Sequence, residues 1–403
     1  MDDWTYGGFG IYIHWPFCSA KCPYCDFNSH VSKKVKQKQW LKGYLSEIQR
    51  VRNTVGPRLV NSVFFGGGTP SLMDPEVVEA VIGAIKSSFP ISNQLEVTLE
   101  ANPTSVEAGR FAAYQDAGVN RISMGIQALN DPDLRRLGRL HTAQEARLAF
   151  ETARNIFARV SFDLIYARQY QTLAQWRAEL SEALAMAVDH FSLYQLTVET
   201  GTAFGDRYKV GRLPGLPNND LGADLYELTQ SLCDAHNMPA YEVSNHAREG
   251  AECLHNLIYW RYGDYAGIGP GAHGRLTLKG QKFATEAFSN PDKWLAAVDQ
   301  GTGEKSAQQI DQTAQATEYL LMGLRIKDGI DLKRFENLAG APLNIEAQTS
   351  LEDMGLLIRS DKTLKATRAG TAVLNSVISS LFCLLYTSPS PRDVEESRMP
   401  SSA

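Results

Sequence analysis

Three cysteines near the start of the chain constrain it more than any other feature. Cys18, Cys22 and Cys25 follow the pattern C-x3-C-x2-C, inside a stretch that runs from residue 12 to residue 27. Three thiolates on one loop can ligate three irons of a [4Fe-4S] cluster, and the missing fourth cysteine leaves one iron open to a non-protein ligand. A zinc knuckle or a redox pair is the alternative, but zinc sites usually take four protein ligands, and no second cysteine pair lies nearby. The spacing therefore favours a cluster with one open iron.

Length and composition bound the class of protein. The chain has 403 residues, 43% of them hydrophobic, which is enough for one large domain and a smaller one. Its formal net charge of -5 argues against a nucleic-acid partner, and the basic run at residues 33–38 is typical of a solvated helix start. The cysteines do not form a disulfide framework, and the first residues lack the regions of a signal peptide. We therefore expect a reduced, cytoplasmic protein.

From about residue 9 to residue 190, short apolar runs alternate with longer amphipathic ones, which is the pattern of βα units on a parallel sheet. Strands are expected at residues 10–14, 62–65, 95–99, 121–125, 160–165 and 190–195. Helices are expected at residues 39–51, 75–89, 106–117, 143–157 and 173–187. Six such units predict an α/β fold, a partial (β/α)6 barrel, with a full eight-stranded barrel as the alternative. In either case reactive groups should lie at the C-terminal strand ends.

Glycines and polar residues follow these strands. The run Gly-Gly-Gly-Thr-Pro-Ser at 66–71 comes after the second strand, and its glycines let the backbone approach a ligand closely. Glu100, Gln127 and Asp163 stand at the ends of the third, fourth and fifth strands. Each alone could be a strand-end cap or a salt-bridge partner. Together, and in this order after a cluster loop, they predict a binding site.

With Leu-Gly-Arg-Leu-His at 137–141, this set resembles the coproporphyrinogen III oxidase-like branch of the radical SAM superfamily over nearly the whole chain. Within that branch it is most similar to the HemW family of haem chaperones. The resemblance implies that the three cysteines ligate a [4Fe-4S] cluster whose open iron binds S-adenosylmethionine. It further implies that one set of residues lines the S-adenosylmethionine pocket: Tyr12, Phe27, Gly67, Gly68, Thr69, Glu100, Gln127, Arg139 and Asp163. A carboxylate there could hold the ligand's ammonium or ribose hydroxyls, and Arg139 could pair a carboxylate bidentately.

One loop departs from the family. Residues 167–172 read Ala-Arg-Gln-Tyr-Gln-Thr, where the family has a Gly-Leu-Pro-like or Arg-Pro-Gly turn before Gln-Thr. The backbone of this loop is therefore expected to differ from that of the family, and the pocket beside it could be altered.

The densest aromatic and histidine stretch lies between residues 241 and 274. Imidazole is a common axial ligand of haem iron, and flat aromatic rings suit a porphyrin face. Any one histidine here could equally be a buried, hydrogen-bonded side chain. The string His-Asn-Leu-Ile-Tyr-Trp at 255–260 resembles the His-Asn-x-x-Tyr-Trp motif that the HemW family associates with haem binding. His255 is accordingly the first candidate haem ligand, with Cys253 and His273 behind it.

Sequence patterns divide the chain into three regions and a C-terminal tail. Residues 1–220 are expected to form the radical SAM partial barrel, 221–300 a HemW-like connecting region, and 301–382 a smaller winged-helix-like α+β domain that packs or docks rather than binding DNA. Residues 383–403 break the helical pattern and look like a translated sequencing adapter, so they are excluded from fold reasoning.

Three functions are consistent with the sequence. The first is a haem chaperone, for which the resemblance implies haem, a haem-accepting protein, an electron donor for the cluster and a peripheral membrane contact through the acceptor. The second is an oxygen-independent coproporphyrinogen III oxidase, and the third is another radical SAM enzyme. The oxidase family carries a long segment before its cysteine motif and a further cysteine soon after the third ligand, whereas here Cys25 is followed by Asp26 and Phe27. These differences favour the chaperone, and whether the chain is also an enzyme stays open.

Overall fold

The computed structural model describes residues 2–32 and 34–383, and it divides the chain into two compact units. Unit 1 comprises Met1–Tyr259 and Gly263–Gln309, and unit 2 comprises Trp260–Tyr262 and Ile310–Ala403. Most of the expected connecting region, 221–300, thus lies in the same unit as the expected barrel, because its strands join the barrel's sheet.

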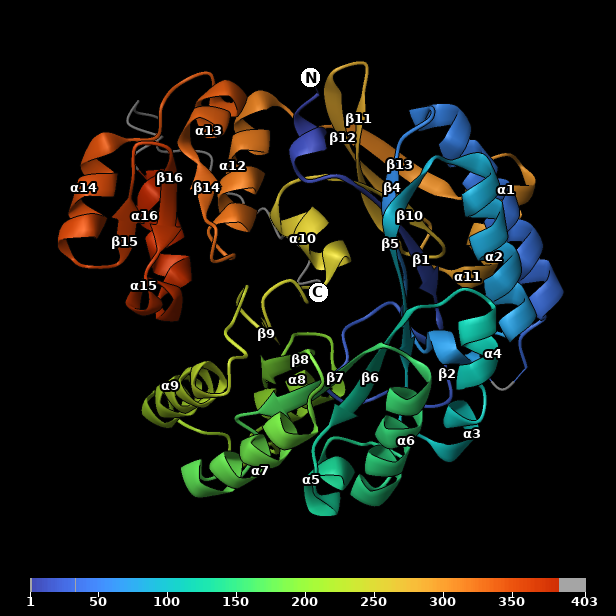
Figure 1. Cartoon of the computed structure of the whole chain (residues 1–403), viewed down its shortest axis with the longest axis horizontal. Coiled ribbons are helices and arrows are strands. Elements are labelled where there is room, and N and C mark those ends of the chain that lie inside the picture. The colour runs from blue at the N-terminus through green and yellow to red at the C-terminus, as the bar shows by residue number, and fades with distance from the viewer. Residues whose placement is uncertain (1, 33, 384–403) are drawn as a thin grey trace. The chain divides into compact units, whose positions relative to one another are not determined.

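Unit 1 is built on one open sheet whose strand order is β13-β12-β11-β10-β1-β4-β5-β6-β7-β8-β9 (Figure 1). Its parallel part confirms the six expected strands: β1 (Phe9–Trp15), β4 (Val60–Gly67), β5 (Ile91–Ala101), β6 (Arg121–Gln127), β7 (Arg159–Tyr166) and β8 (His190–Gln195). Five more strands extend the two edges: β9 (Asn245–Ala247), β10 (Asp264–Ile268), β11 (His273–Leu278), β12 (Gln281–Ala287) and β13 (Glu304–Gln309). The sheet does not close, so the eight-stranded alternative is excluded.

Helices follow the parallel strands and cover the outer face of the sheet in Figure 1. They are α1 (Gln37–Val55), α2 (Pro75–Ser88), α3 (Ser105–Ala108), α4 (Phe111–Asp116), α5 (Asp131–Arg136), α6 (Ala143–Ile156) and α7 (Leu173–Met186). The helix expected at 106–117 is two short helices, since α3 ends before Gly109. Capping boxes begin α6 at Thr142 and α7 at Thr172, where the threonine side chain and the residue three positions later satisfy each other's free N–H groups.

The remaining helices of unit 1 are α8 (Ala203–Lys209), α9 (Asn219–Ala235), α10 (Leu254–Trp260) and α11 (Pro291–Asp299). Short elements complete it: η1 (Asp3–Tyr6), β2 (Phe17–Cys18), β3 (His30–Val31) and η2 (Pro70–Leu72).

Alternation along β1 separates the core from the site. Phe9, Ile11 and Ile13 are fully buried among apolar side chains, whereas Tyr12 and His14 contact polar groups and each other. Because successive strand residues point to opposite faces, one face of the sheet packs under the helices and the other carries the polar groups of the barrel interior.

Unit 2 is a small α+β domain around a three-stranded antiparallel sheet, β14-β16-β15. Its strands are β14 (Ile330–Asp331), β15 (Leu357–Arg359) and β16 (Thr363–Ala366), and its helices are α12 (Gln312–Gly323), α13 (Leu332–Ala339), α14 (Ile345–Asp353), α15 (Arg368–Ala372) and α16 (Leu374–Cys383). Leu320, Phe335 and Leu364 are fully buried at its centre. The elements match the expected winged-helix-like pattern. Of the expected adapter, residues 383–403, the part from 384 to 403 lies outside the described residues, and Cys383 is the last residue of α16 rather than a break in the helix.

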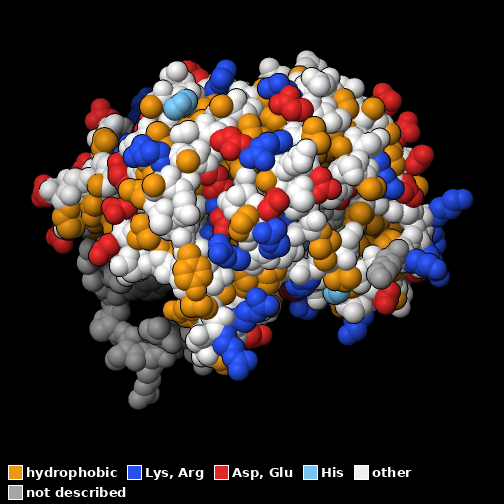
Figure 2. Space-filling view, turned by 90° about the horizontal axis from the view of Figure 1, so that it is seen from below, with side chains coloured by type: hydrophobic (Ala, Val, Ile, Leu, Met, Phe, Trp, Pro, Cys, Tyr) orange, Lys and Arg blue, Asp and Glu red, His pale blue; other side chains and the backbone are white. Residues whose placement is uncertain are grey.

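Within the described ranges, no helix is both long enough and apolar enough to cross a membrane. On the face drawn in Figure 2, basic, acidic and apolar side chains are interspersed rather than gathered by kind.

Candidate cofactor-binding site

The cysteine loop is held at both ends. Cys18 ends β2, which pairs with β3, and the backbone N–H of Ser32 donates to the carbonyl of Cys18 at 3.2 Å. Inside the loop, the N–H of Cys25 donates to the carbonyl of Cys22 at 3.2 Å. The loop therefore folds back so that its three thiols face a common region.

The thiols interact electrostatically. Burial raises the pKa of Cys18 and of Cys25, and in both cases the neighbouring Cys22 adds to the rise. Arg139 opposes this, since its guanidinium donates to Cys22 Sγ at 3.3 Å and lowers the pKa of Cys18. The Thr69 hydroxyl also lowers the pKa of Cys18 through a hydrogen bond. The loop thus supplies donors and a positive charge that would favour thiolates once iron binds.

Two kinds of metal site use cysteine thiolates in this way. Among the described residues, no group of three or more histidine, cysteine or acidic side chains is placed to hold a single metal ion. A zinc ion would draw its ligands into one tetrahedron, whereas a four-iron cluster takes each thiolate at a different corner. Cys22 raises the pKa of Cys18 and of Cys25, so the three thiols lie near one another, as either kind of site requires.

The expected pocket residues form a connected set at the strand ends. The N–H of Gly67, at the end of β4, donates to the Glu100 carboxylate on β5, and Asp163 on β7 lies near enough to raise the pKa of Glu100. Gly67 has φ 108°, and a Cβ there would meet the His14 ring at 2.5 Å, so only glycine fits. Gly68 is equally confined, since its Cβ would lie 2.7 Å from the Phe17 carbonyl oxygen.

Two buried carboxyl groups give the pocket its charge. Burial, followed by the nearby Asp163, raises the pKa of Glu100 to about 8. Burial raises the pKa of Asp163 to about 6, against the opposing effects of the Ser192 hydroxyl and the Arg121 and Arg139 guanidinium groups. A ligand that carries positive charge would offset the burial cost and favour both carboxylates. The pocket is thus suited to a cation.

Arg139 links three segments around the cysteine loop. It donates to Asn102 Oδ1 at 2.6 Å and to the carbonyl of Gly125 at 2.8 Å, besides Cys22, and its bidentate pairing with a carboxylate in the ligand pocket stays a prediction. Asn102 also donates to the Thr69 hydroxyl at 3.3 Å. These contacts tie the cysteine loop to the ends of β5 and β6.

Phe27 and Gln127 also belong to the expected S-adenosylmethionine pocket, and their environments differ from each other. Phe27 is 44% exposed, and its backbone N–H lowers the pKa of Cys25. Gln127 ends β6 with φ 72°, and its Oε1 is buried without a hydrogen-bond partner among the described residues.

Tyr12 is positioned by His14, whose Nδ1 lies 3.0 Å from the tyrosine hydroxyl. The other ring nitrogen of His14, Nε2, lies 2.9 Å from the carbonyl of Asn28, just after the cysteine loop. Sequence reasoning missed His14, although it stands two residues after Tyr12 on the same face of the strand.

The first haem candidate, His255, is enclosed rather than available. It is 1% exposed on α10, with Nδ1 2.7 Å from Ser62 Oγ and Nε2 2.6 Å from the Tyr259 hydroxyl. Its ring stacks on Phe64 and Tyr12, with centroids 5.0 and 6.2 Å apart. Burial lowers its pKa to about 3, so the ring is neutral. In this conformation both ring nitrogens of His255 are engaged in hydrogen bonds, and its role as a haem ligand stays a prediction.

The other two haem candidates differ from each other. Cys253 is 1% exposed, its thiol donates to Glu96 Oε1 at 3.3 Å, and burial, followed by Glu96, raises its pKa to about 12. His273, at the start of β11, is exposed. Of the three, only His273 presents its side chain to a ligand from solvent.

Comparison with known proteins decides the family. The model of the radical SAM superfamily matches residues 12–181, and that of the HemN C-terminal domain matches residues 310–373. The protein named heme chaperone HemW from Escherichia coli is 38% identical, over 78% of this chain and 82% of its own length. This chain belongs to the HemW-like family of radical SAM proteins.

Proteins with other names are also similar to this HemW-like chain. Radical S-adenosyl methionine domain-containing protein 1, mitochondrial, from Bos taurus is 37% identical over 97% of this chain and 90% of its own length. Among solved structures, coproporphyrinogen III oxidase (HemN) from Escherichia coli superposes with a TM-score of 0.78 at 20% identity, covering 93% of this chain and 90% of that one, which shows a shared fold. The cofactors of the superfamily, a [4Fe-4S] cluster and S-adenosylmethionine, are those that the cysteine loop and the acidic pocket fit.

Proposed function

We propose that this HemW-like chain is a haem chaperone, which binds haem as cargo and delivers it to an acceptor protein. The proposal rests mainly on sequence identity. Relatives named heme chaperone HemW resemble this chain along most of their own length and most of its length. The His-Asn-x-x-Tyr-Trp string adds to it.

We assign the nine pocket residues to S-adenosylmethionine and the three cysteines to the cluster. Cys18, Cys22 and Cys25 would hold the cluster, and the chemistry that it would supply there is electron transfer to the sulfonium of the bound ligand. Glu100 and Asp163 provide negative charge for the cationic ligand, and the free Oε1 of Gln127 is a hydrogen-bond acceptor for it. Tyr12 and His14 support the cysteine loop from β1.

His273 is our preferred haem contact. Its side chain is exposed, whereas His255 and Cys253 are enclosed and already hydrogen-bonded. The His-Asn-x-x-Tyr-Trp segment then contributes through packing, because the His255 ring stacks on the ring of Tyr12, which we assign to the pocket. A rearrangement of α10 would be needed before His255 could bind iron.

The second candidate function is coproporphyrinogen III decarboxylation. The similarity of the fold to HemN favours it, but that similarity is of fold alone. The absence of a further cysteine directly after Cys25, where Asp26 and Phe27 stand, weighs against it.

A haem titration of the anaerobically reconstituted protein tests the proposal. We expect stable haem binding, seen as a shifted Soret band that survives gel filtration, and no decarboxylation of coproporphyrinogen III after reduction with S-adenosylmethionine present. His273→Ala should weaken haem binding, whereas His255→Ala should lower the melting temperature first. Decarboxylated product from the wild type would favour the enzyme, and haem binding that depends on His255 and not on His273 would restore the original ranking.

The acceptor protein, an electron donor for the cluster, a membrane contact through the acceptor and a cytoplasmic location remain parts of the proposal. Some relatives are named as mitochondrial proteins, so the family is not confined to one compartment.

A further inference from the structure

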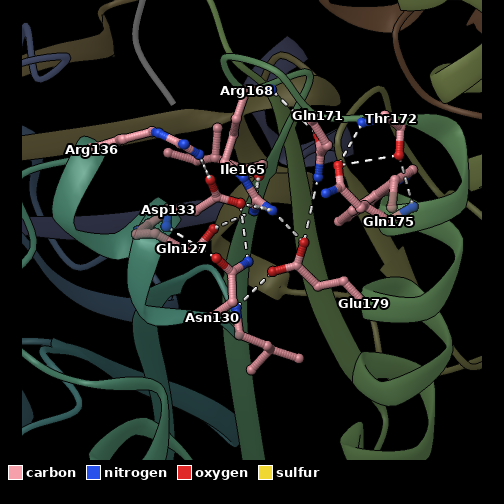
Figure 3. A network of polar contacts seen from close by, with 12 residues as sticks. Gln127, Asn130, Asp133, Arg136, Ile165, Arg168, Gln171, Thr172, Gln175 and Glu179 are labelled. Carbon is pink, nitrogen blue, oxygen red and sulfur yellow. Dashed lines mark hydrogen bonds and ion pairs between the residues drawn. The ribbon is translucent and has the colours of Figure 1, made fainter.

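A buried polar network lies directly beside the proposed S-adenosylmethionine pocket, in the loop where the sequence departs from its family. Figure 3 shows it at the ends of β6 and β7, with Arg168 at its centre. Arg168 is 2% exposed and follows β7 immediately after Ala167, whose φ is 58°. A buried arginine at a turn of this kind needs several acceptors to be tolerated.

Arg168 has two carboxylate partners on different helices. Its Nη2 lies 2.9 Å from Asp133 Oδ2 on α5 and also bonds Glu179 on α7. Glu179 is in turn fixed by Gln171, whose Nε2 donates to it at 3.4 Å, and by the N–H of Leu129, which donates at 2.6 Å. Asp133 is fixed by Asn130, whose Nδ2 donates to it at 3.0 Å. The guanidinium is therefore held in one orientation.

The other guanidinium nitrogen points at main chain. Nη1 of Arg168 donates to the carbonyl of Ile165 at 2.7 Å and to that of Gln127 at 3.4 Å. The Gln127 carbonyl belongs to the residue that ends β6 with φ 72°, just after a register shift between Met124 and Gln127 in the pairing with β7. A non-glycine residue in this conformation is disfavoured unless its surroundings hold it. Arg168 and the register shift supply that restraint.

The conformation of the Gln127 backbone also determines where the Gln127 side chain lies in the pocket. Because the backbone of Gln127 is turned, its side chain lies back over Gly125, where a Cβ would sit 3.0 Å from Gln127 Nε2. A longer residue at 125 would displace that amide. Gly125 also accepts a hydrogen bond from Arg139, which reaches the cysteine loop. The orientation of the Gln127 side chain is thus set from two sides.

We infer that Arg168 is a positioning residue for the S-adenosylmethionine pocket: it holds the backbone of Gln127 so that the free side-chain oxygen of Gln127 meets the ligand. The inference rests on the proposed binding role of Gln127. In the loop 167–172, Nη2 of Arg168 is anchored by Asp133 and Glu179, and this anchoring directs Nη1 at the Gln127 carbonyl.

The test compares S-adenosylmethionine affinity among variants of the full chain with a reconstituted cluster, by isothermal titration. Arg168→Met should weaken binding by about tenfold, the range of couplings between residues in one network, with the iron content unchanged. Arg168→Lys keeps a charge for Asp133 and Glu179 but loses the fork that also reaches the Gln127 carbonyl, so its affinity should fall although its melting temperature stays closer to that of the wild type.

A double-variant cycle separates positioning from general stability. If Arg168 acts through Gln127, Arg168→Met added to Gln127→Ala should weaken binding little beyond Gln127→Ala alone. Arg159→Met is the matched control, because Arg159 also pairs with two carboxylates, Glu96 and Asp189, and begins the same strand β7 at the end away from the pocket. It should lower the melting temperature and leave the affinity unchanged.

The outcomes are distinguishable. Additive losses in the cycle, or an equal loss of affinity in the Arg159 control, would overturn the inference while leaving the proposed function intact. A wild-type protein with a full cluster that binds no S-adenosylmethionine would overturn the inference and the assignment of the pocket, and would leave haem binding to be judged by its own titration. A wild type that binds S-adenosylmethionine but not haem would refute the chaperone alone.

Discussion

The pKa of Glu100 predicts that S-adenosylmethionine binding depends strongly on pH. Burial and the neighbouring Asp163 raise the pKa of Glu100 to about 8, so the side chain is mostly protonated at pH 7 before the ligand arrives. The ligand is a cation, and it favours the carboxylate. Binding near neutral pH must therefore release a proton from Glu100, and the affinity should rise with pH.

The size of the change in affinity depends on the difference between the pKa of Glu100 and the pH of the measurement. At pH 7, one unit below a pKa of about 8, ionising Glu100 costs about 1.4 kcal/mol, which corresponds to an affinity about tenfold below its plateau. The affinity should increase between pH 6 and 8 and become level above about pH 9. Asp163, whose pKa is raised to about 6, adds a smaller increase between pH 5 and 7 with the same sign.

The assay is the dissociation constant of S-adenosylmethionine for the reconstituted protein, measured from pH 6 to pH 9 beside the variant Glu100→Gln. The titration of the ligand and of the cluster is common to both proteins, so the ratio of the two affinities isolates Glu100. That ratio should change by about tenfold between pH 7 and 9. A ratio that stays constant, or that falls as pH rises, would refute the assignment of Glu100 as a carboxylate that binds the cation.

Other predictions follow from the cysteine loop, a buried ion pair and the enclosed histidine. Alanine at all three positions of the cysteine loop should abolish the cluster's visible absorbance and paramagnetic signal after reconstitution; full iron content in this variant would end the cluster assignment. Asp264→Asn should lower the free energy of unfolding by about 3–5 kcal/mol in a denaturant titration, because it leaves the buried Arg58 and Lys282 without their shared carboxylate; a loss below about 1 kcal/mol would mean that water already reaches this site. Tyr259→Phe should cost about 1–3 kcal/mol, since it leaves a ring nitrogen of His255 buried and unpaired; unchanged stability would indicate that His255 finds another partner.

Much of the fold could be predicted because the periodicity of parallel βα units is local. Each strand from β1 to β8 in the parallel part is a short apolar run followed by a helix-period pattern, and the six were placed correctly from these runs. The strands β10 to β13 were missed. β13 is mostly exposed and carries little apolar pattern. β10 pairs in parallel with the free edge of β1, and β11, β12 and β13 then add to it one after another as antiparallel strands.

The site was predicted in part for a related reason. Residues at the C-terminal ends of parallel strands meet at one edge of the sheet, so Gly67, Glu100 and Gln127 could be grouped from their order alone. Asp163 lies inside β7, which continues to Tyr166, and from there it is near enough to raise the pKa of Glu100. The partners of the pocket residues could not be grouped in this way. Arg139 bonds Cys22, Asn102 and the Gly125 carbonyl, which come from three segments that are distant in the sequence, so no local pattern pairs them.

The sequence by itself determined the cysteine loop, the order of the strands that carry the pocket, and the family, because each depends on residue types at fixed spacing. Tertiary structure alone decided which side chains are accessible. The sequence ranks His255 ahead of His273 as an iron ligand, yet the His255 ring stacks on Phe64 and Tyr12 with both nitrogens hydrogen-bonded, whereas His273 is exposed. Arg168 looks like a surface residue in an irregular loop, and it becomes the centre of a buried network only when α5 and α7 bring Asp133 and Glu179 to it. Burial and hydrogen bonding between distant segments depend on how the chain folds in three dimensions, and no local pattern encodes them.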